Sequence, residues 1–295
     1  MNVPHLHQPQ TLEEDSILIG KILQGSQQDL EALIVRHQGW IYNIALKMTM
    51  DPHDAEDVTQ EILIKLITKL ATYSAQRGSF RTWLYRIVAH HVINMKKRKY
   101  EKLFSSFDEC EAAAVKLPDD AMDASPEALV LVEELKIKCL TGLLLCLNRK
   151  QRLIFIMSEI FDVGNAEGSE IMEVSEVAYR QTLSRARKKV YHFINQNCGL
   201  IHPDNPCHCN NKLKGFIRIG FVDPANLLFY KHKVKTIQET IGRNKQALHQ
   251  FYSMDSARLL YKEHPFYDPP EFEKRIANLL KADGLSLLAS EILHQ

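Results

Sequence analysis

Apolar residues recur at helical spacing through most of the first hundred residues. The segments 29–48, 51–70 and 79–99 each carry apolar side chains three or four positions apart, with polar residues between them. This spacing is typical of amphipathic α-helices, which bury one face against a neighbour. The pattern therefore predicts packed helices across residues 12–100.

Residues that cap helices stand where these patterns begin. Asp51 is followed by Pro52, a residue suited to the first helical position, and Ser79 precedes the third segment. Asn148, with Gln151 three residues later, resembles a capping box for a further helix. We expect helices to begin at these three caps.

The composition changes between residues 101 and 126, where acidic and small residues are interrupted by prolines. Such a stretch predicts a linker. Helical spacing resumes over 127–197, in which a tight turn at Glu173 precedes a basic helix starting after Ser175. Two helices joined by a tight turn, the second of them basic, outline a helix-turn-helix.

Residues 198–295 form a mostly helical C-terminal extension by pattern. Within it, residues 216–224 predict a short extended or loop piece, and residues 233–294 are helical again in spacing. We find no strand-rich stretch, so the predicted fold class is all-α.

Composition narrows the function classes. The chain has 295 residues and a formal net charge of +1, so contacts with nucleic acid must come from local basic patches. No basic-then-apolar leader opens the chain and no apolar run could span a bilayer, so we expect a cytoplasmic protein with no membrane partner. Six cysteines in a reducing compartment argue against a disulfide framework.

Four segments of the sequence together resemble a known family. "DAEDVTQEILIKL" resembles the polymerase-binding helix of sigma region 2, and "SFRTWLYRIVAHHVINMKKRK" resembles the promoter-melting helix that follows it. "LNRKQRLIFIM" and "NAEGSEIMEVSEVAYRQTLSRARKKV" resemble sigma region 4. The chain is therefore similar to an extracytoplasmic-function (ECF) sigma factor, a bacterial subunit of RNA polymerase.

The resemblance implies a domain plan and partners. Region 2 would occupy 12–100, an acidic linker 101–126, region 4 127–197 and an extension with a candidate regulatory role 198–295. The implied partners are core RNA polymerase, through the clamp of its largest subunit, and promoter DNA. An anti-sigma factor is a possible further partner but has no support in the sequence. No cofactor is required, and the protein would not be an enzyme.

The same resemblance assigns residues to three interfaces. The polymerase-docking group is Asp54, Asp57, Gln60 and Glu61. The −10 group, which would contact the promoter element near −10, is Arg77, Ser79, Arg86, His90, Asn94, Lys96, Lys97 and Arg98. The −35 group is Ser175, Glu176, Arg180, Gln181, Ser184, Arg185, Arg187 and Lys188, the first members reaching base edges and the later cations, with Lys189, holding phosphates.

This sequence departs from the family pattern at a few positions. His90 and Asn94 stand where the family commonly has Asn followed by Asp. The base sequence of the −10 element that this chain would read is therefore not predicted. Gly168 replaces an aliphatic core residue, and Glu173 replaces the usual turn glycine, which is costly if that turn needs a positive φ. Phe80, Trp83 and Leu84 are expected to be core.

The segment "CGLIHPDNPCHC" holds three cysteines in a C-x8-C-x-C spacing. Cys198, Cys207 and Cys209, with His208 or His202, could ligate zinc or another metal, because a turn at "HPDNP" would bring the ends together. A thiol redox switch and simple packing remain open alternatives. We expect Cys139 and Cys146 to be core, and Cys110 has no partner that the sequence identifies.

Two rival functions fit the sequence less well. A helix-turn-helix regulator that does not join the polymerase would not need the "DAEDVTQE" helix. A metal-dependent enzyme centred on the cysteine segment would need an open coordination position on its metal for the substrate. Three thiolates and a histidine would fill all four positions of zinc. We find no G-x-S-x-G, H-E-x-x-H or phosphate-loop motif in the sequence.

Overall fold

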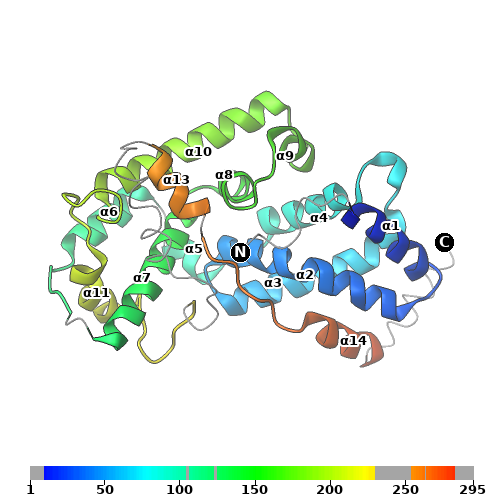
Figure 1. Cartoon of the computed structure of the whole chain (residues 1–295), viewed down its shortest axis with the longest axis horizontal. Helices are drawn as coiled ribbons and strands as arrows, with labels where there is room; N and C mark the ends of the chain where they lie inside the picture. The colour runs from blue at the N-terminus through cyan, green and yellow to red at the C-terminus, as the bar shows by residue number, and fades with distance from the viewer. Residues whose placement is uncertain (1–9, 104–105, 123–124, 230–253, 263, 283–295) are drawn as a thin grey trace.

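The structure, a computed structural model, describes residues 10–103, 106–122, 125–229, 254–262 and 264–282. Every regular element in these ranges is a helix, and the only β-type pairing is an isolated bridge between Cys198 and Cys207. Figure 1 shows the helices gathered in two lobes that touch along the middle of the molecule. The all-α prediction is confirmed.

The first lobe is built from helices that begin where the sequence predicts caps. Its elements are α1 (Gln10–Ile22), α2 (Gln27–Thr49), α3 (Pro52–Lys69), the short 3-10 turns η1 (Leu70–Thr72) and η2 (Ala75–Arg77), and α4 (Phe80–Asn94). The Asp51 carboxylate accepts the amides of His53 and Asp54, and the Ser79 hydroxyl accepts the amide of Thr82. Both predicted caps are confirmed.

The second lobe carries the helix-turn-helix. Its elements are α7 (Pro126–Leu145), α8 (Arg149–Phe155), the π-helical η3 (Ile156–Ile160), α9 (Asn165–Ile171) and α10 (Glu176–Asn197). Asn148 accepts the amide of Gln151 and so caps α8 as predicted. The interior of this lobe and that of the first form one continuous apolar core, because α4 packs against both α8 and α9.

The linker and the extension contain more helix than the sequence pattern suggested. The linker holds α5 (Lys99–Leu103) and α6 (Phe107–Lys116), and the extension holds α11 (Cys209–Arg218), α13 (Met254–Lys262) and α14 (Phe272–Ala282). The prediction of an extended or loop piece from residue 216 was wrong for 216–218, which complete the last turn of α11. Most of the predicted helical tail, 233–253 and 283–294, lies outside the described residues.

A buried ion-pair cluster joins the linker to both lobes. Glu101 of α5 accepts hydrogen bonds from Arg149, at 2.9 and 2.7 Å, and from Arg152, at 2.9 Å. The Arg152 side chain is 3% exposed and the Glu101 side chain 4% exposed. We call Glu101, Arg149 and Arg152 the Glu101 cluster.

The two arginines also satisfy carbonyl groups at three helix ends. Arg149 donates to the carbonyls of Ile93, Met95 and Lys96, just where α4 ends. Arg152 donates to the Met48 carbonyl in the last turn of α2, and also to carbonyls near the end of α7, those of Leu144, Leu145 and Leu147. The last carbonyls of a helix have no partner within it, so these arginines stabilise three helix ends at once.

This arrangement accounts for a difference from the sequence prediction. Helix α4 stops at Asn94 rather than continuing to residue 99, and Met95 turns away with a ψ of 159°. Because Arg149 takes up the carbonyls of Met95 and Lys96, the chain leaves the helix there. Lys96 and Lys97 therefore lie in an exposed connection between α4 and α5.

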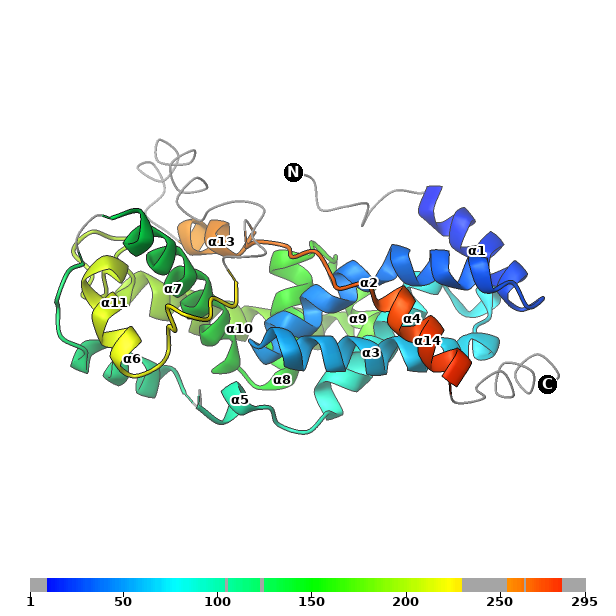
Figure 2. The same cartoon turned by 90° about the horizontal axis from the view of Figure 1, so that it is seen from below.

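Residues 264–271, which we call the strap, cross from the second lobe to the first. The Asn43 side chain exchanges two hydrogen bonds with the Tyr267 backbone, at 2.8 and 2.9 Å, and Lys47 donates to the Pro265 carbonyl. Figure 2 shows the strap running beside α2 between α13 and α14. The extension thus contacts both lobes.

Two further pairings fix the ends of the strap. Before it, Arg258 of α13 lies 3.1 Å from Glu159 of η3, and after it Arg275 of α14 lies 2.7 Å from Glu56 of α3.

In the described ranges, no helix has the length and apolar character needed to cross a membrane.

We predict that Glu101→Gln lowers the free energy of unfolding by about 3–5 kcal/mol, because the buried Arg152 loses its counterion. Burial alone would raise the pKa of Glu101, but hydrogen bonds from Arg149 and the charge of Arg152 outweigh it and lower the pKa to about 2. The carboxylate therefore stabilises the fold above its ordinary pKa of 4.5, and this contribution is lost as the pH falls toward about 2.

Urea unfolding at a series of pH values measures this effect. Between about pH 5 and pH 2, the free energy of unfolding should fall less for the variant than for wild type, because the variant lacks the Glu101 carboxylate. Glu111→Gln, on the exposed side of α6, is the matched control and should change stability by less than about 0.5 kcal/mol. Equal stability of the two variants would contradict the role given to Glu101.

Candidate polymerase and DNA interface

The polymerase-docking group lies along one side of α3. Asp57 and Glu61 are exposed, whereas Asp54 and Gln60 are partly buried. The Asp54 carboxylate accepts a hydrogen bond from Arg98 at 3.2 Å, and Glu61 lies 3.2 Å from His91. Of the acidic members, Asp57 is therefore the one without such an ion pair among the described contacts.

Burial and nearby charges shift the pKa values of two side chains at the docking group, Asp54 and its neighbour His91. Burial raises the pKa of Asp54 from its ordinary value, and the nearby Arg98 opposes that rise. Burial and the charge of Lys65 lower the pKa of His91, whose Nδ1 lies 2.6 Å from the Lys65 amine. A neutral imidazole is thus favoured beside Glu61.

The members of the −10 group differ in exposure. Arg77, His90, Asn94, Lys96 and Lys97 are exposed, and of these Asn94 donates from its side chain to the His90 carbonyl at 2.9 Å. The other members are less exposed and also have partners within the chain. Ser79 caps α4, Arg98 pairs with Asp54, and Arg86 donates from Nε to the Glu170 carbonyl at 3.0 Å.

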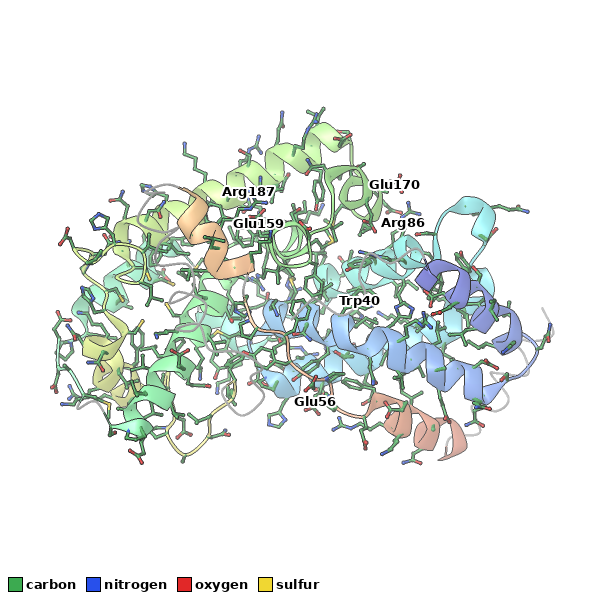
Figure 3. All side chains as sticks on the ribbon, viewed as in Figure 1. Trp40, Glu56, Arg86, Glu159, Glu170 and Arg187 are labelled. Carbon is green, nitrogen blue, oxygen red and sulfur yellow. The ribbon has the colours of Figure 1, made fainter. Side chains whose placement is uncertain are left out.

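The contact of Arg86 is notable because Glu170 belongs to the helix-turn-helix of the other lobe. Figure 3 shows Arg86 on α4 facing Glu170 on α9. Five residues earlier on α4, Arg81 lies 3.4 Å from Glu167, which also belongs to α9. The helix-turn-helix therefore covers part of the surface predicted to read the −10 element.

The −35 group lies on α10. Ser175 caps the helix by accepting the amide of Ala178, and Glu176 pairs with Arg180 at 3.2 Å across one exposed turn. The members that follow on the outer face, Gln181, Ser184, Arg185 and Lys188, are all exposed. Tyr179, Leu183, Ala186 and Val190 are buried on the opposite face, as the spacing predicts.

Arg187 has a structural contact that its assigned role did not include. Its guanidinium bonds to Glu159, whose side chain has no exposed area and also accepts from the Tyr191 hydroxyl. Figure 3 shows Arg187 and Glu159 facing each other between α10 and η3. A phosphate contact by Arg187 stays a prediction, alongside this ion pair.

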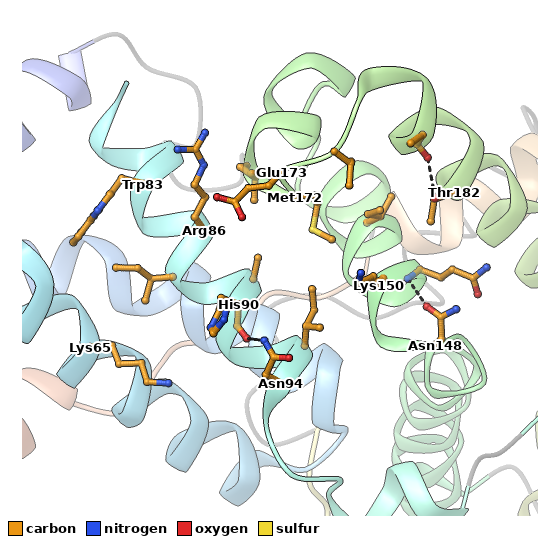
Figure 4. A pocket seen from close by; sticks show the side chains of 18 of the residues that line it. Lys65, Trp83, Arg86, His90, Asn94, Asn148, Lys150, Met172, Glu173 and Thr182 are labelled. Carbon is orange, nitrogen blue, oxygen red and sulfur yellow. Dashed lines mark hydrogen bonds between the residues drawn. The ribbon is translucent and has the colours of Figure 1, made fainter. Parts of the chain in front are cut away.

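A groove of about 800 Å³ separates the two lobes on this side. Its walls include Arg86, His90 and Asn94 from α4, Lys150 from α8 and Arg185 from α10. Figure 4 shows Arg86, His90 and Asn94 on one side of the groove and Lys150 on the other. Members of the −10 group and one member of the −35 group therefore face a common basic channel.

The structure accounts for Gly168 and shows the backbone conformation of Glu173, the two departures in the helix-turn-helix. A side-chain carbon added at Gly168 would clash with the Tyr179 ring, whose hydroxyl is held by Ser158 at 2.8 Å. Tyr179 thus fills the space that an aliphatic residue would occupy. Glu173 has a φ of 53°, so the turn does adopt the left-handed conformation that a non-glycine residue enters at some cost.

The cysteine segment folds back on itself. Cys198 and Cys207 pair through a parallel bridge, with the Gly199 amide donating to the Cys207 carbonyl at 3.0 Å. Asn205 donates to the Cys198 carbonyl and so helps to terminate α10. The predicted turn, which brings these two cysteines together, is confirmed.

The thiols share a cavity but do not form a metal site as they stand. Cys198, Cys207, Cys209 and Cys139 line a cavity of about 510 Å³, and burial raises the pKa of each thiol, that of Cys198 to about 11. Among the residues that the structure describes, no three Cys, His, Asp or Glu side chains are placed to hold one ion. Metal binding by these cysteines with His208 gains no support from this geometry and stays a prediction.

The sequence did not reveal the residues that join the lobes. Glu101 looked like one more acid of the linker, and Asn43 and Lys47 looked like ordinary members of a helix. The one usable signal was Arg149 and Arg152, two arginines three residues apart at a helix start, where cations are disfavoured unless they serve a partner. The partner itself could not be read from the sequence.

Comparison with known proteins matches both lobes to one family. The Sigma-70 region 2 model matches residues 33–101 and the Sigma-70 region 4 model matches residues 137–190. SigE of Mycolicibacterium smegmatis, an ECF RNA polymerase sigma factor, is 32% identical over 76 residues, which cover 26% of this chain and 29% of SigE. The match thus spans less than a third of that relative's length.

Two other similarities are longer and more distant. SigW of Bacillus subtilis, an ECF RNA polymerase sigma factor, is 23% identical over 172 residues, covering 58% of this chain and 91% of SigW. The structure titled CnrH in complex with the cytosolic domain of CnrY has a TM-score of 0.41 and 18% identity, covering 62% of this chain and 97% of that one.

We predict that Arg187→Ala lowers the free energy of unfolding by about 1–3 kcal/mol, because Glu159 loses a charged donor at a buried position. Lys188→Ala, at the exposed neighbouring position, should change stability by less than about 0.5 kcal/mol. Thermal unfolding of the two variants measures the difference. Equal melting temperatures would show that the Glu159 pair contributes nothing to the fold.

Proposed function

We propose that this chain, which belongs to the ECF sigma factors, directs core RNA polymerase to its promoters and initiates transcription there. The observation that carries the proposal is the presence of both sigma regions, in order, each with exposed polar side chains. The chain would work in the cytoplasm, as a polymerase subunit rather than as an enzyme, and without a required cofactor.

In this proposal the clamp of the largest polymerase subunit binds the docking group on α3. Asp57 supports this role best, because it is exposed and adjoins a face that the apolar core does not need. Asp54 and Glu61 would have to exchange Arg98 and His91 for partners on the polymerase. Polymerase binding would thereby free Arg98 for promoter DNA.

The helix-turn-helix would read the −35 element. Glu176, Arg180, Gln181 and Ser184 lie toward the start of α10, where side chains can reach base edges in the major groove. Arg185 and Lys188 follow on the same exposed face and suit phosphate contacts. We assign these roles as proposals for this chain.

Reading both promoter elements at once requires the lobes to separate. The elements lie about 25 base pairs apart, roughly 85 Å at 3.4 Å per base pair. Here Arg86 of the −10 group is hydrogen-bonded to the helix-turn-helix at 3.0 Å. We infer that this is a closed form and that an open form engages the promoter.

We propose that the strap opposes this opening and gives the extension its regulatory role. It ties α2 to the extension through Asn43 and Lys47, and α14 reaches Glu56, the residue next to Asp57 of the docking group. Separation of the lobes has to break some of these contacts. A weaker strap should therefore favour the open form.

We predict that Asp57→Arg weakens binding to core RNA polymerase at least tenfold, about 1.4 kcal/mol, because it places a cation where the docking face needs an anion. Promoter-dependent transcription with core polymerase should fall in parallel. Glu111→Arg makes the same charge reversal on α6 and should leave both measurements unchanged. If wild type does not stimulate transcription by core polymerase, the proposed function is wrong. If wild type is active but Asp57→Arg binds core polymerase as tightly as wild type does, the assignment of the docking face is wrong.

We predict that Asn43→Ala has effects of opposite sign on stability and on polymerase binding. It should lower the free energy of unfolding, since the Tyr267 backbone loses both partners, and it should raise the affinity for core polymerase by loosening the strap. Asp268→Asn, an exposed change within the strap, is the control. A variant that is both less stable and weaker in polymerase binding would show that Asn43 only supports the fold.

A further inference from the structure

Two cysteines outside the "CGLIHPDNPCHC" segment lie in contact. The Sγ atoms of Cys110, in α6, and Cys146, at the end of α7, are 3.2 Å apart. Each side chain is partly exposed, and Cys110 also lines the 510 Å³ cavity. The sequence identified no partner for Cys110, and the expectation that Cys146 is simply a core residue did not include this contact.

The local backbone holds this pair in register. Cys110 lies in the first turn of α6, where its amide donates to the Ser106 carbonyl, and the Cys146 thiol also lies 3.5 Å from that carbonyl. Phe107 packs on Phe193 of α10 with ring centroids 5.7 Å apart, which seats α6 on the second lobe. The Ser106 side chain caps α6 by accepting the Glu109 amide. This cap and the aromatic contact fix α6 so that the Cys110 thiol faces that of Cys146.

We propose that Cys110 and Cys146 are a peroxide-responsive pair that closes to a disulfide and shortens the tether between the two lobes. Cys110 is the attacking thiol and Cys146 the resolving one. The Cys110 thiolate attacks one oxygen of hydrogen peroxide, the O–O bond breaks, and Cys110 becomes a sulfenic acid. The other peroxide oxygen leaves as hydroxide, which takes up a proton from solvent to become water. The Cys146 sulfur then attacks the Cys110 sulfur, the S–S bond forms, and the Cys146 proton leaves with the hydroxyl group as water.

The surroundings favour this division of roles. The Cys146 thiol donates toward Cys110, which lowers the pKa of Cys110 despite its partial burial, and the start of α6 further suits a thiolate. The same contact and burial raise the pKa of Cys146, so that it keeps its proton until the second step. Two electrons leave the two thiols and reduce one peroxide to water.

The disulfide would change how far the lobes can separate. In the reduced chain the linker 101–126 provides 26 residues, a reach of about 90 Å when extended. Bonding Cys110 to α7 leaves only residues 101–110, which are 10 residues with a reach of about 35 Å. The oxidised chain would be confined near its closed form. This regulatory consequence rests on the proposed function, whereas the disulfide itself does not.

Peptide mapping after peroxide treatment tests the site. The full chain is exposed to hydrogen peroxide, alkylated and digested with trypsin, which releases residues 103–116 and 139–149 as separate peptides. We expect these two peptides to be joined, with loss of two hydrogen atoms from the intact mass and reversal by a dithiol. Cys139→Ala is the matched control, because Cys139 shares the second peptide, and the link should survive in it.

Transcription tests the tether. Wild type and Cys110→Ser are treated with peroxide, freed of it and added to untreated core polymerase. Oxidised wild type should lose promoter-dependent transcription at least tenfold and regain it with a dithiol, and Cys110→Ser should be unaffected. A link between Cys198 and Cys207 instead, or full activity of the Cys110–Cys146 linked form, would overturn the proposal. Inactivity of the reduced wild type would count against the proposed function and leave the mapping result standing.

Discussion

The burial of Glu101 between Arg149 and Arg152 is the interaction on which the arrangement of the lobes depends. A carboxylate in a dry interior is stable only with charged donors around it, and a buried guanidinium needs its anion equally. Here each arginine also satisfies carbonyls at the ends of α2, α4 or α7. The linker is therefore a structural part of the closed molecule, although its composition looks like that of a solvated spacer.

The same closure creates a tension between stability and function. The groove between the lobes holds basic side chains from both predicted DNA-reading groups, and the surface of α4 that should meet single-stranded promoter lies against α9. Two acids of the docking face, Asp54 and Glu61, are partly neutralised by Arg98. Contacts that stabilise the free chain thus occupy groups that partners would use, and binding of those partners must supply the free energy of separation.

Much of the fold was predictable because it follows from local rules. Asp51, Ser79 and Asn148 cap helices where the sequence places them, and the buried stripe of α10 follows the 3.6-residue period. The long-range partners were not predictable, because one sequence does not tell which Arg a given Glu will meet. Asn43 reads as a polar position on α2 until the strap, 224 residues further on, supplies Tyr267. The contact of Cys110 was not predictable for the same reason, because its partner Cys146 lies 36 residues further along the chain.

The claim that the free chain is a closed form that opens on the polymerase can be tested by a distance. Fluorescent labels on Gln28, in α2, and Gln196, near the end of α10, report the separation of the lobes at exposed positions outside the proposed interfaces. We predict a short distance in the free chain and an increase of at least about 30 Å in a transcribing complex with core polymerase and promoter, as the 85 Å between the elements requires. An unchanged distance in a complex that initiates transcription would contradict the account.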